Sequence, residues 1–267
     1  MTPDHPLFSI EPQEDGRFGL QVTQPISVSR AGNGFMFGGT GLAASVLALE
    51  CLSGRPAIWA TAQYLSYAKP GSALTIAATL PSTGKNISQG RATIWHGETE
   101  ILSTTASLGE RTGLTDQWAA LDPVPRPEDC AETPHWGDSG TISTRFNFRA
   151  ARGSFSDAPR EHKRSDDGRL LVWIKPVEPM VIDRIVLAVI ADFLSPGVRN
   201  ATGRKIGGNS LDNTIRYCAI VPTEWVLCDI AIEALASGIT HGTMRIFAEN
   251  GALMAIASQS MIQRIRD

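Results

Sequence analysis

The chain has 267 residues, of which 42% are hydrophobic and 19% charged, and its formal net charge is −3. This composition is typical of an ordinary globular protein with one large domain or two small ones. The slight acidity, with a pI of about 6.0, offers no basic face, so we expect no nucleic-acid partner.

The chain carries four scattered cysteines with no Cys-x-x-Cys spacing, which indicates reduced thiols and a cytoplasmic protein. Residues 1–15 lack a charged-then-apolar signal pattern. No apolar run approaches the roughly 18 residues that span a bilayer, so we expect no membrane partner. The five histidines lack the spacing of metal ligands, so we expect neither a metal nor a cofactor.

In chain order, the first half begins with strand-like segments at residues 8–11 and 18–23. A long apolar helix is predicted over residues 38–52, entered through a pair of glycines. Only β-rich runs follow, to about residue 108. Residues 116–136 then carry four prolines and several acids, which is typical of a linker that crosses the surface.

The second half repeats this order, with strands at 144–150 and 170–176, a helix at 180–194, and β-rich runs to residue 260. Apolar residues fall on all sides of the second helix, as in a helix that is buried all round. Two repeats, each with one long helix and an antiparallel sheet, make an α+β protein. We divide it into residues 1–115, a linker at 116–140, and residues 141–267.

Asp192 lies near the end of the second apolar helix. A carboxylate on a buried helix is costly unless it is hydrogen-bonded or its pKa rises, which makes Asp192 a candidate functional group. The alternative is an exposed aspartate in the last turn, since the Ser-Pro-Gly sequence at 195–197 is predicted to stop the helix.

Several short motifs are distinctive: Phe-Gly-Gly at 37–39, Ala-Asp-Phe at 191–193, Asn-Ser-Leu-Asp-Asn at 209–213, Glu-Trp-Val-Leu at 224–227, and Gly-Ala-Leu-Met-Ala-Ile-Ala-Ser-Gln at 251–259, with Arg264 beyond. With this order of elements, the chain resembles the double hotdog fold. Its C-terminal half is similar to the acyl-CoA thioesterase II (TesB-like) family.

The resemblance implies an acyl-CoA substrate and a homodimer or higher homo-oligomer. It places the catalytic set on Asp192, Ser210 and Gln259, and substrate-binding positions on Phe193, Gly38 and Gly39. Position 210 departs from the family's threonine but keeps a hydroxyl, while Ser-Met at 260–261 replaces an acidic residue and a glycine. A serine lacks the methyl group that restricts the threonine rotamer, so the site is expected to be looser.

These residue types suit thioester hydrolysis. A carboxylate can take a proton from water as general base, while a hydroxyl and an amide fix the direction of attack. Each residue also has a structural alternative. Gln259 could satisfy a neighbour in a buried strand, and Ser210 could begin a strand. Asp212 is a rival carboxylate that could instead pair with Arg216 or Arg245, or hold the loop.

The repeat serves as an internal comparison, because sequence alignment sets Glu50 opposite Asp192, Ala60 opposite Ser210, and Ser107 opposite Gln259. The first half therefore keeps an acid but lacks the hydroxyl and the amide, which predicts one active site per chain. Glu50 as a second base is the alternative.

Two other functions remain open at this point. One is a non-catalytic protein that binds acyl-CoA or an acyl carrier. The other is a hydratase or dehydratase of the same fold. Such enzymes pair an acid with a histidine, and His241 on a predicted strand is the nearest candidate.

Overall fold

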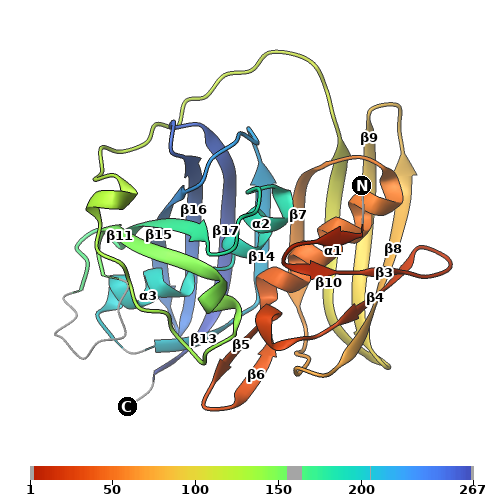
Figure 1. Cartoon of the computed structure of the whole chain (residues 1–267), viewed down its shortest axis with the longest axis horizontal. Helices are drawn as coiled ribbons and strands as arrows, with labels where there is room; N and C mark the ends of the chain where they lie inside the picture. The colour runs from red at the N-terminus through yellow and green to blue at the C-terminus, as the bar shows by residue number, and fades with distance from the viewer. Residues whose placement is uncertain (1–2, 155–163, 205, 266–267) are drawn as a thin grey trace.

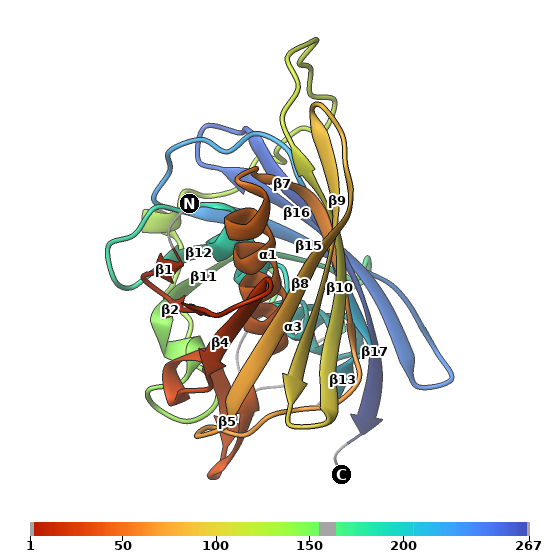
Figure 2. The same ribbon diagram turned by 90° about the vertical axis from the view of Figure 1, so that its right-hand side faces the viewer.

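The computed structural model describes residues 3–154, 164–204 and 206–265. Its main feature is one 13-stranded antiparallel sheet in the order β11-β12-β15-β16-β17-β14-β7-β10-β9-β8-β4-β3, with β13 added beside β17. The sheet curves around the helices, so that one of its faces meets the core (Figures 1 and 2).

The first half contributes a long helix and the strands that wrap it. Its elements are β1 (Asp4–His5), β2 (Phe8–Ser9), β3 (Glu11–Pro12), β4 (Arg17–Gln21), η1 (Gln24–Ile26), β5 (Ser27–Arg30), β6 (Asn33–Met36), α1 (Gly38–Ser53), β7 (Ala57–Tyr64), β8 (Ala73–Thr83), β9 (Ile87–His96) and β10 (Thr99–Gly109).

The second half follows the same order, with extra elements after its first helix. Its elements are η2 (Pro127–Asp129), η3 (Ile142–Arg145), β11 (Phe146–Arg152), β12 (Arg169–Pro176), α2 (Arg184–Ile190), α3 (Ser195–Thr202), β13 (Ile206–Ser210), β14 (Asp212–Tyr217), β15 (Val226–Ala236), β16 (Ile239–Ala248) and β17 (Leu253–Ile265). The predicted double hotdog architecture is confirmed.

The two halves join through β7 and β14, which pair antiparallel at the centre of the sheet (Figure 1). Thr61 and Thr214 face each other in this ladder, and their hydroxyl oxygens lie 2.9 Å apart. The ladder converts two half-sheets into one continuous layer, so each half loses an exposed strand edge.

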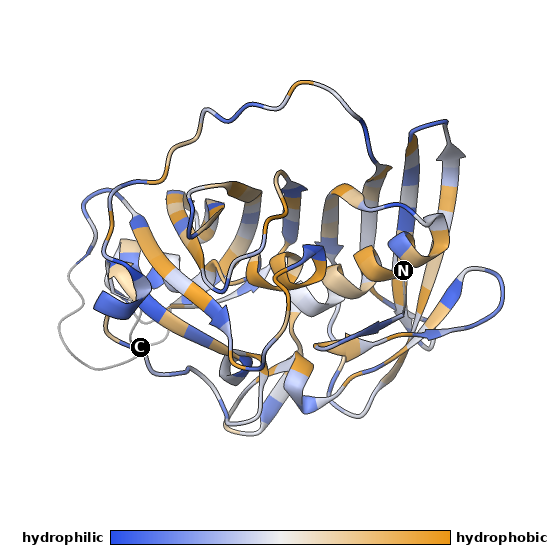
Figure 3. Ribbon diagram, turned by 45° about the horizontal axis from the view of Figure 1, so that its top comes forward, coloured by the Kyte–Doolittle hydropathy of each residue, from blue (hydrophilic) through white to orange (hydrophobic). Residues whose placement is uncertain are grey.

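Helices α1 and α2 pack together under this layer and share one hydrophobic core with its strands. Figure 3 shows hydrophobic residues on the helices and along the strands. The beginning of α1 lies against the end of α2, because a Cβ on Gly39 would come within 2.8 Å of the Val189 carbonyl oxygen. The two helices therefore run in opposite directions, and each helix end meets the opposite end of its partner.

The second helix differs from the prediction over residues 180–194. It begins only at Arg184, because the Asp183 carboxylate caps it by accepting hydrogen bonds from the N–H groups of Ile185 and Val186. It ends at Ile190, and residues 191–194 form a turn. The Ser-Pro-Gly sequence then begins α3 instead of stopping a helix, since proline is well tolerated in a first helical turn.

The helical stretch Arg184–Thr202 is 19 residues long and apolar enough, with a mean hydropathy of 1.2, to meet the length and composition of a membrane span. The expectation that no such run exists was therefore wrong. However, 72% of the stretch is buried inside the protein, which is the situation of a core helix.

The segment between the halves packs against the second half instead of only crossing its surface. Trp173 donates its indole N–H to the Pro125 carbonyl oxygen at 3.0 Å, and Arg149 donates to the Pro127 carbonyl oxygen at 2.8 Å. A second apolar cluster forms beneath it, containing Cys130, Leu171, Trp173, Leu227, Phe247 and Leu253. The far face of the second half-sheet is thereby covered.

Candidate active site

Asp192 lies in the turn directly after α2 and is only 5% exposed, which excludes the exposed-aspartate alternative. Its Oδ2 accepts a hydrogen bond of 2.7 Å from the backbone N–H of Gly39 in the first turn of α1. The carboxylate therefore caps a helix of the other half, where the helix dipole favours negative charge. Its second oxygen, Oδ1, is left to face the strands.

Ser210 and Gln259 meet that second oxygen. The Ser210 hydroxyl lies 3.4 Å from Asp192 Oδ1. Gln259, which is 2% exposed, donates through Nε2 to the same carboxylate oxygen and also to Ser210 Oγ, the latter at 3.0 Å. The fold thus brings together three residues from the α2 turn, β13 and β17 that are widely separated in the sequence.

The ionisation of Asp192 reflects two opposing effects. Burial raises its pKa to about 6, while hydrogen bonds from Gln259, Gly39 and Ser210, and the neighbouring Asn213 amide, act in the other direction. The desolvation of a buried carboxylate is only partly offset by its donors. A carboxylate with such a pKa is a stronger base than an exposed one and is still largely ionised at neutral pH.

Gly38 and Gly39 allow α1 to approach this carboxylate. A Cβ on Gly39 would lie 2.8 Å from Asp192 Cβ, and one on Gly38 would lie 2.8 Å from Asp192 Oδ2. Distances this short exclude any side chain at either position unless neighbouring atoms move. Of the expected substrate-binding positions, these two therefore border the site directly.

Phe193 is placed differently from the other expected site residues. It is 1% exposed, and its ring stacks on Phe37 at a centroid distance of 5.1 Å. Three further rings meet it edge-on, those of Trp136, Phe146 and Phe148. Phe193 therefore lies in an aromatic cluster that supports the turn carrying Asp192.

Two residues that sequence reasoning missed also line this region. Asn213 is completely buried, and its amide lies beside both Asp192 and Tyr64. Burial raises the pKa of both groups, and the Asn213 amide offsets only a small part of each rise. The signal was present in the alternation of β14, because Asn213 shares its face with the buried Ile215.

The rival groups lie elsewhere. Asp212 points to the other face of β14, and its Oδ1 accepts the backbone N–H of Ser260 at 2.8 Å, which makes it a local structural contact. Among the described residues, Asp212 forms no ion pair with Arg216 or Arg245, and Arg245 instead pairs with Asp229 at 2.5 Å. His241 is exposed and lies 3.1 Å from Ser260 Oγ.

Glu50 is 4% exposed and occupies the matching place in the first half, where its Oε1 accepts the Ala57 N–H at 2.7 Å. Burial raises its pKa. The strand ladders correct the sequence alignment here. Gly90 pairs with Ala106 as Gly242 pairs with Gln259, so Ala106, not Ser107, stands where Gln259 does.

The same register sets Asn213 in the place of Ala60, and Ser210 in the place of Ala57. The sequence alignment was wrong because the second half has two extra elements, α3 and β13, between its helix and its next long strand. The position of the resulting gap cannot be fixed from weakly similar residues. The conclusion drawn from it still holds, because alanines in the first half replace the hydroxyl and the amide.

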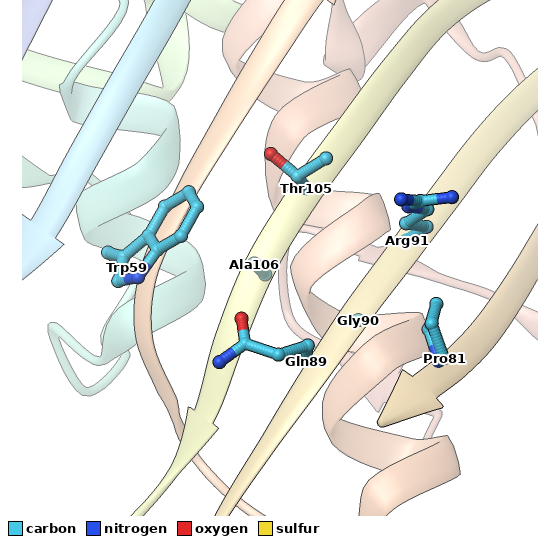
Figure 4. Close-up of a pocket in the computed structure, with 7 residues that line it drawn as sticks. All are labelled: Trp59, Pro81, Gln89, Gly90, Arg91, Thr105 and Ala106. Carbon is cyan, nitrogen blue, oxygen red and sulfur yellow. The ribbon is translucent and has the colours of Figure 1, made fainter. Parts of the chain in front are cut away.

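A hollow elsewhere on the molecule does not belong to this site. It lies over β7 to β10 on the side of the sheet away from α1, and Figure 4 shows its lining side chains in front of the strands. Its lining residues are Trp59, Pro81, Gln89, Gly90, Arg91, Thr105 and Ala106. Within the described part of the chain, no group of three or more His, Cys, Asp or Glu could hold a metal ion.

The sheet, the paired helices and this site define a double hotdog protein of α+β class. A family model for the acyl-CoA thioesterase C-terminal domain matches residues 120–263, which is more than half of the chain. The chain therefore belongs to this thioesterase family and is TesB-like. No curated protein sequence gives a significant match.

Solved structures agree on the fold. A proposed thioesterase from Novosphingobium aromaticivorans has 28% identity and a TM-score of 0.87, over 99% of this chain and 100% of that one. A hot dog fold protein from Alicyclobacillus acidocaldarius has 18% identity and a TM-score of 0.85, over 97% of each chain. An acyl-CoA thioesterase II, TesB2, from Mycobacterium marinum has 18% identity and a TM-score of 0.77, over 97% of each.

Proposed function

We propose that the protein hydrolyses acyl-CoA thioesters to free fatty acid and CoA, with Asp192 as the general base. The observation that carries this proposal is the cluster in which the buried Asp192 carboxylate meets a hydroxyl and an amide. Membership of the thioesterase family supports the same reaction.

In the proposed reaction, Asp192 removes a proton from a water molecule whose oxygen attacks the thioester carbonyl carbon. Collapse of the tetrahedral intermediate breaks the carbon–sulfur bond, and CoA leaves as a thiolate that takes up a proton. Ser210 and the Gln259 amide orient the water and the carboxylate. Thioesters are reactive enough that this arrangement needs no covalent intermediate on the protein.

The helix dipole of α1 opposes complete protonation of Asp192, and burial opposes complete ionisation. The balance leaves a base that is ionised at neutral pH yet basic enough to accept a proton from water. A hydratase mechanism, which would pair the acid with a histidine, is not favoured, because His241 is exposed and forms its hydrogen bond with Ser260.

The test is the release of free thiol from a panel of acyl-CoA esters of increasing chain length, followed with a thiol reagent. We expect thiol release from at least one ester and its loss in an Asp192→Asn variant. Tight binding of the esters without thiol release from any of them would instead establish a non-catalytic acyl-CoA binding protein.

A further inference from the structure

Asn213 and Tyr64 lie next to the proposed base but have no part in the reaction described above. Asn213 faces the helices from β14. In the antiparallel ladder between β14 and β17, the next residue, Thr214, pairs with Ser258. Asn213 is therefore a cross-strand neighbour of Gln259. The backbone N–H of Tyr64, at the end of β7, donates to the Leu211 carbonyl oxygen at 2.9 Å.

The Tyr64 ring and the Asp192 carboxylate approach the same point from two sides. A Cβ on Gly38 would lie 3.0 Å from Tyr64 Cζ, the carbon that carries the hydroxyl, and 2.8 Å from Asp192 Oδ2. Asp192, Asn213 and Tyr64 thus form one contiguous group of polar side chains beside the N-terminus of α1.

Three polar atoms of this pair are buried and have no hydrogen-bond partner of standard geometry among the described residues: Asn213 Oδ1, Asn213 Nδ2 and the Tyr64 hydroxyl oxygen. Leaving a buried polar group unsatisfied costs on the order of 1–3 kcal/mol, so such groups are rare and call for a reason. Gln259 Oε1, which lies beside them, is also buried and has no hydrogen-bond partner among the described residues.

The equivalent place around Glu50 shows that the fold does not itself need these polar groups. In β7, Ala60 takes the place that Asn213 takes in β14, so an apolar methyl group is compatible with that position. Tyr217 takes the place of Tyr64, and its hydroxyl is satisfied by donating to the Arg184 carbonyl oxygen at 3.0 Å. The unsatisfied amide and hydroxyl, one from each half of the chain, both lie beside Asp192, whereas the equivalent place beside Glu50 holds an alanine and a satisfied tyrosine, as far as the structure describes the two.

We propose that Asn213 is a further catalytic residue, whose amide donates a hydrogen bond to the carbonyl oxygen of the bound thioester. Tyr64 is a positioning residue, whose hydroxyl donates to Asn213 Oδ1 once the substrate is bound and so directs the amide nitrogen toward the reacting carbonyl. This inference rests on the proposed thioesterase function and extends it to the substrate oxygen.

The chemistry requires a donor at this point. When the water oxygen adds to the carbonyl carbon, the carbonyl oxygen gains negative charge, and a preorganised donor stabilises it more than it stabilises the ground state. The Asn213 amide is well suited, because it is neutral, fully shielded from solvent, and held on a central strand.

Two non-hydrolysable CoA analogues test the contact directly. A ketone analogue, with a methylene in place of the sulfur, keeps the carbonyl oxygen, whereas an alkyl-CoA thioether lacks it. We expect Asn213→Ala to weaken binding of the ketone analogue about tenfold, as for one lost hydrogen bond, and to leave binding of the thioether within about twofold. Tyr64→Phe should weaken ketone binding less, with the same selectivity.

Unchanged thioether binding also shows that each variant is folded. Gln63→Ala, an exposed neighbour of Tyr64 on β7, serves as the matched control and should leave both affinities unchanged. In turnover, Asn213→Ala should lower kcat by about 10²–10³-fold with little change in KM. Equal weakening of both analogues, or of neither, would overturn the assignment of Asn213.

Wild-type hydrolysis tests the proposed function, and the selectivity between analogues tests Asn213, so the two can fail separately. A wild-type protein that hydrolyses thioesters, together with an Asn213→Ala variant of equal kcat, would remove Asn213 from the reaction and leave Asp192 in place. A wild-type protein that hydrolyses no thioester would remove the reaction itself, whatever the analogues show.

Discussion

The backbone N–H of Gly39 donates a 2.7 Å hydrogen bond to Asp192 Oδ2, so the beginning of one half's helix holds the carboxylate of the other half. This contact does two things at once. It satisfies an N–H group at the helix end, and it fixes the carboxylate so that Oδ1 faces Ser210 and Gln259.

We expect Asp192→Asn to lower the rate of acyl-CoA hydrolysis by about 10²–10⁴-fold, since an amide cannot act as a general base. Glu50→Gln should keep nearly the full rate, because the glutamine oxygen can still accept the Ala57 N–H. Steady-state kinetics on purified variants checks both. If Glu50→Gln lost activity and Asp192→Asn kept it, the active site would belong to the first half.

The pH dependence follows from the pKa of Asp192, which is about 6 because burial raises it. The general base must be ionised, so kcat/KM should rise with pH, reach half its maximum near pH 6, and level off above about pH 7. A profile measured with a thioester substrate and corrected for stability checks this. A half-maximum near pH 4 would mean that the reacting carboxylate is exposed to solvent.

Removing Gln259 should move this profile. Its hydrogen bond is the largest contribution that favours the ionised carboxylate, so Gln259→Met should raise the pKa of Asp192 and shift the acid limb to higher pH. Ser210→Ala should shift it less, because the Ser210 hydroxyl lies at 3.4 Å from the carboxylate. An unshifted limb in Gln259→Met would argue against direct contact with the base.

The same pKa predicts an effect on stability. The folded-state pKa of Asp192 lies above its unfolded value near 3.9, so its contribution to stability is full below pH 4 and is lost as pH rises through 6. Asp192→Asn removes this titration. Between pH 4 and pH 7, its unfolding free energy should therefore gain up to about 3 kcal/mol relative to wild type.

Denaturant unfolding at both pH values measures that difference, and a pH-independent offset from altered hydrogen bonds cancels in it. A gap between variant and wild type that stays constant from pH 4 to pH 7 would show that Asp192 titrates in the folded protein as it does in water.

Gly39→Ala should destabilise the fold by about 1–3 kcal/mol, because the added methyl group would lie 2.8 Å from Asp192 Cβ and from the Val189 carbonyl oxygen. Activity should fall with it, since Asp192 must move. Gly113→Ala is the matched control, because nothing lies within 4 Å of its added carbon. Thermal unfolding and kinetics of the pair check the claim, and equal stability of both variants would contradict it.

Sequence periodicity predicted the elements well where one strong pattern dominated. The first helix was expected over residues 38–52 and runs over Gly38–Ser53, because its apolar residues are continuous and Gly54 ends it in a left-handed conformation. The second was overextended at both ends. Apolarity alone did not reveal that Asp183 would cap the helix or that the chain would turn after Ile190.

The sequence by itself determined the repeat, the helix–sheet plan of each half, and the three side chains nominated by resemblance. The tertiary structure alone decided that Asp192 is buried against α1, that Ala106 matches Gln259, and that Asn213 and Tyr64 join the site. The physical reason is that burial, pKa and hydrogen-bond partners depend on contacts between elements far apart in the chain. Local patterns specify which face of a strand is buried, but not what lies opposite it.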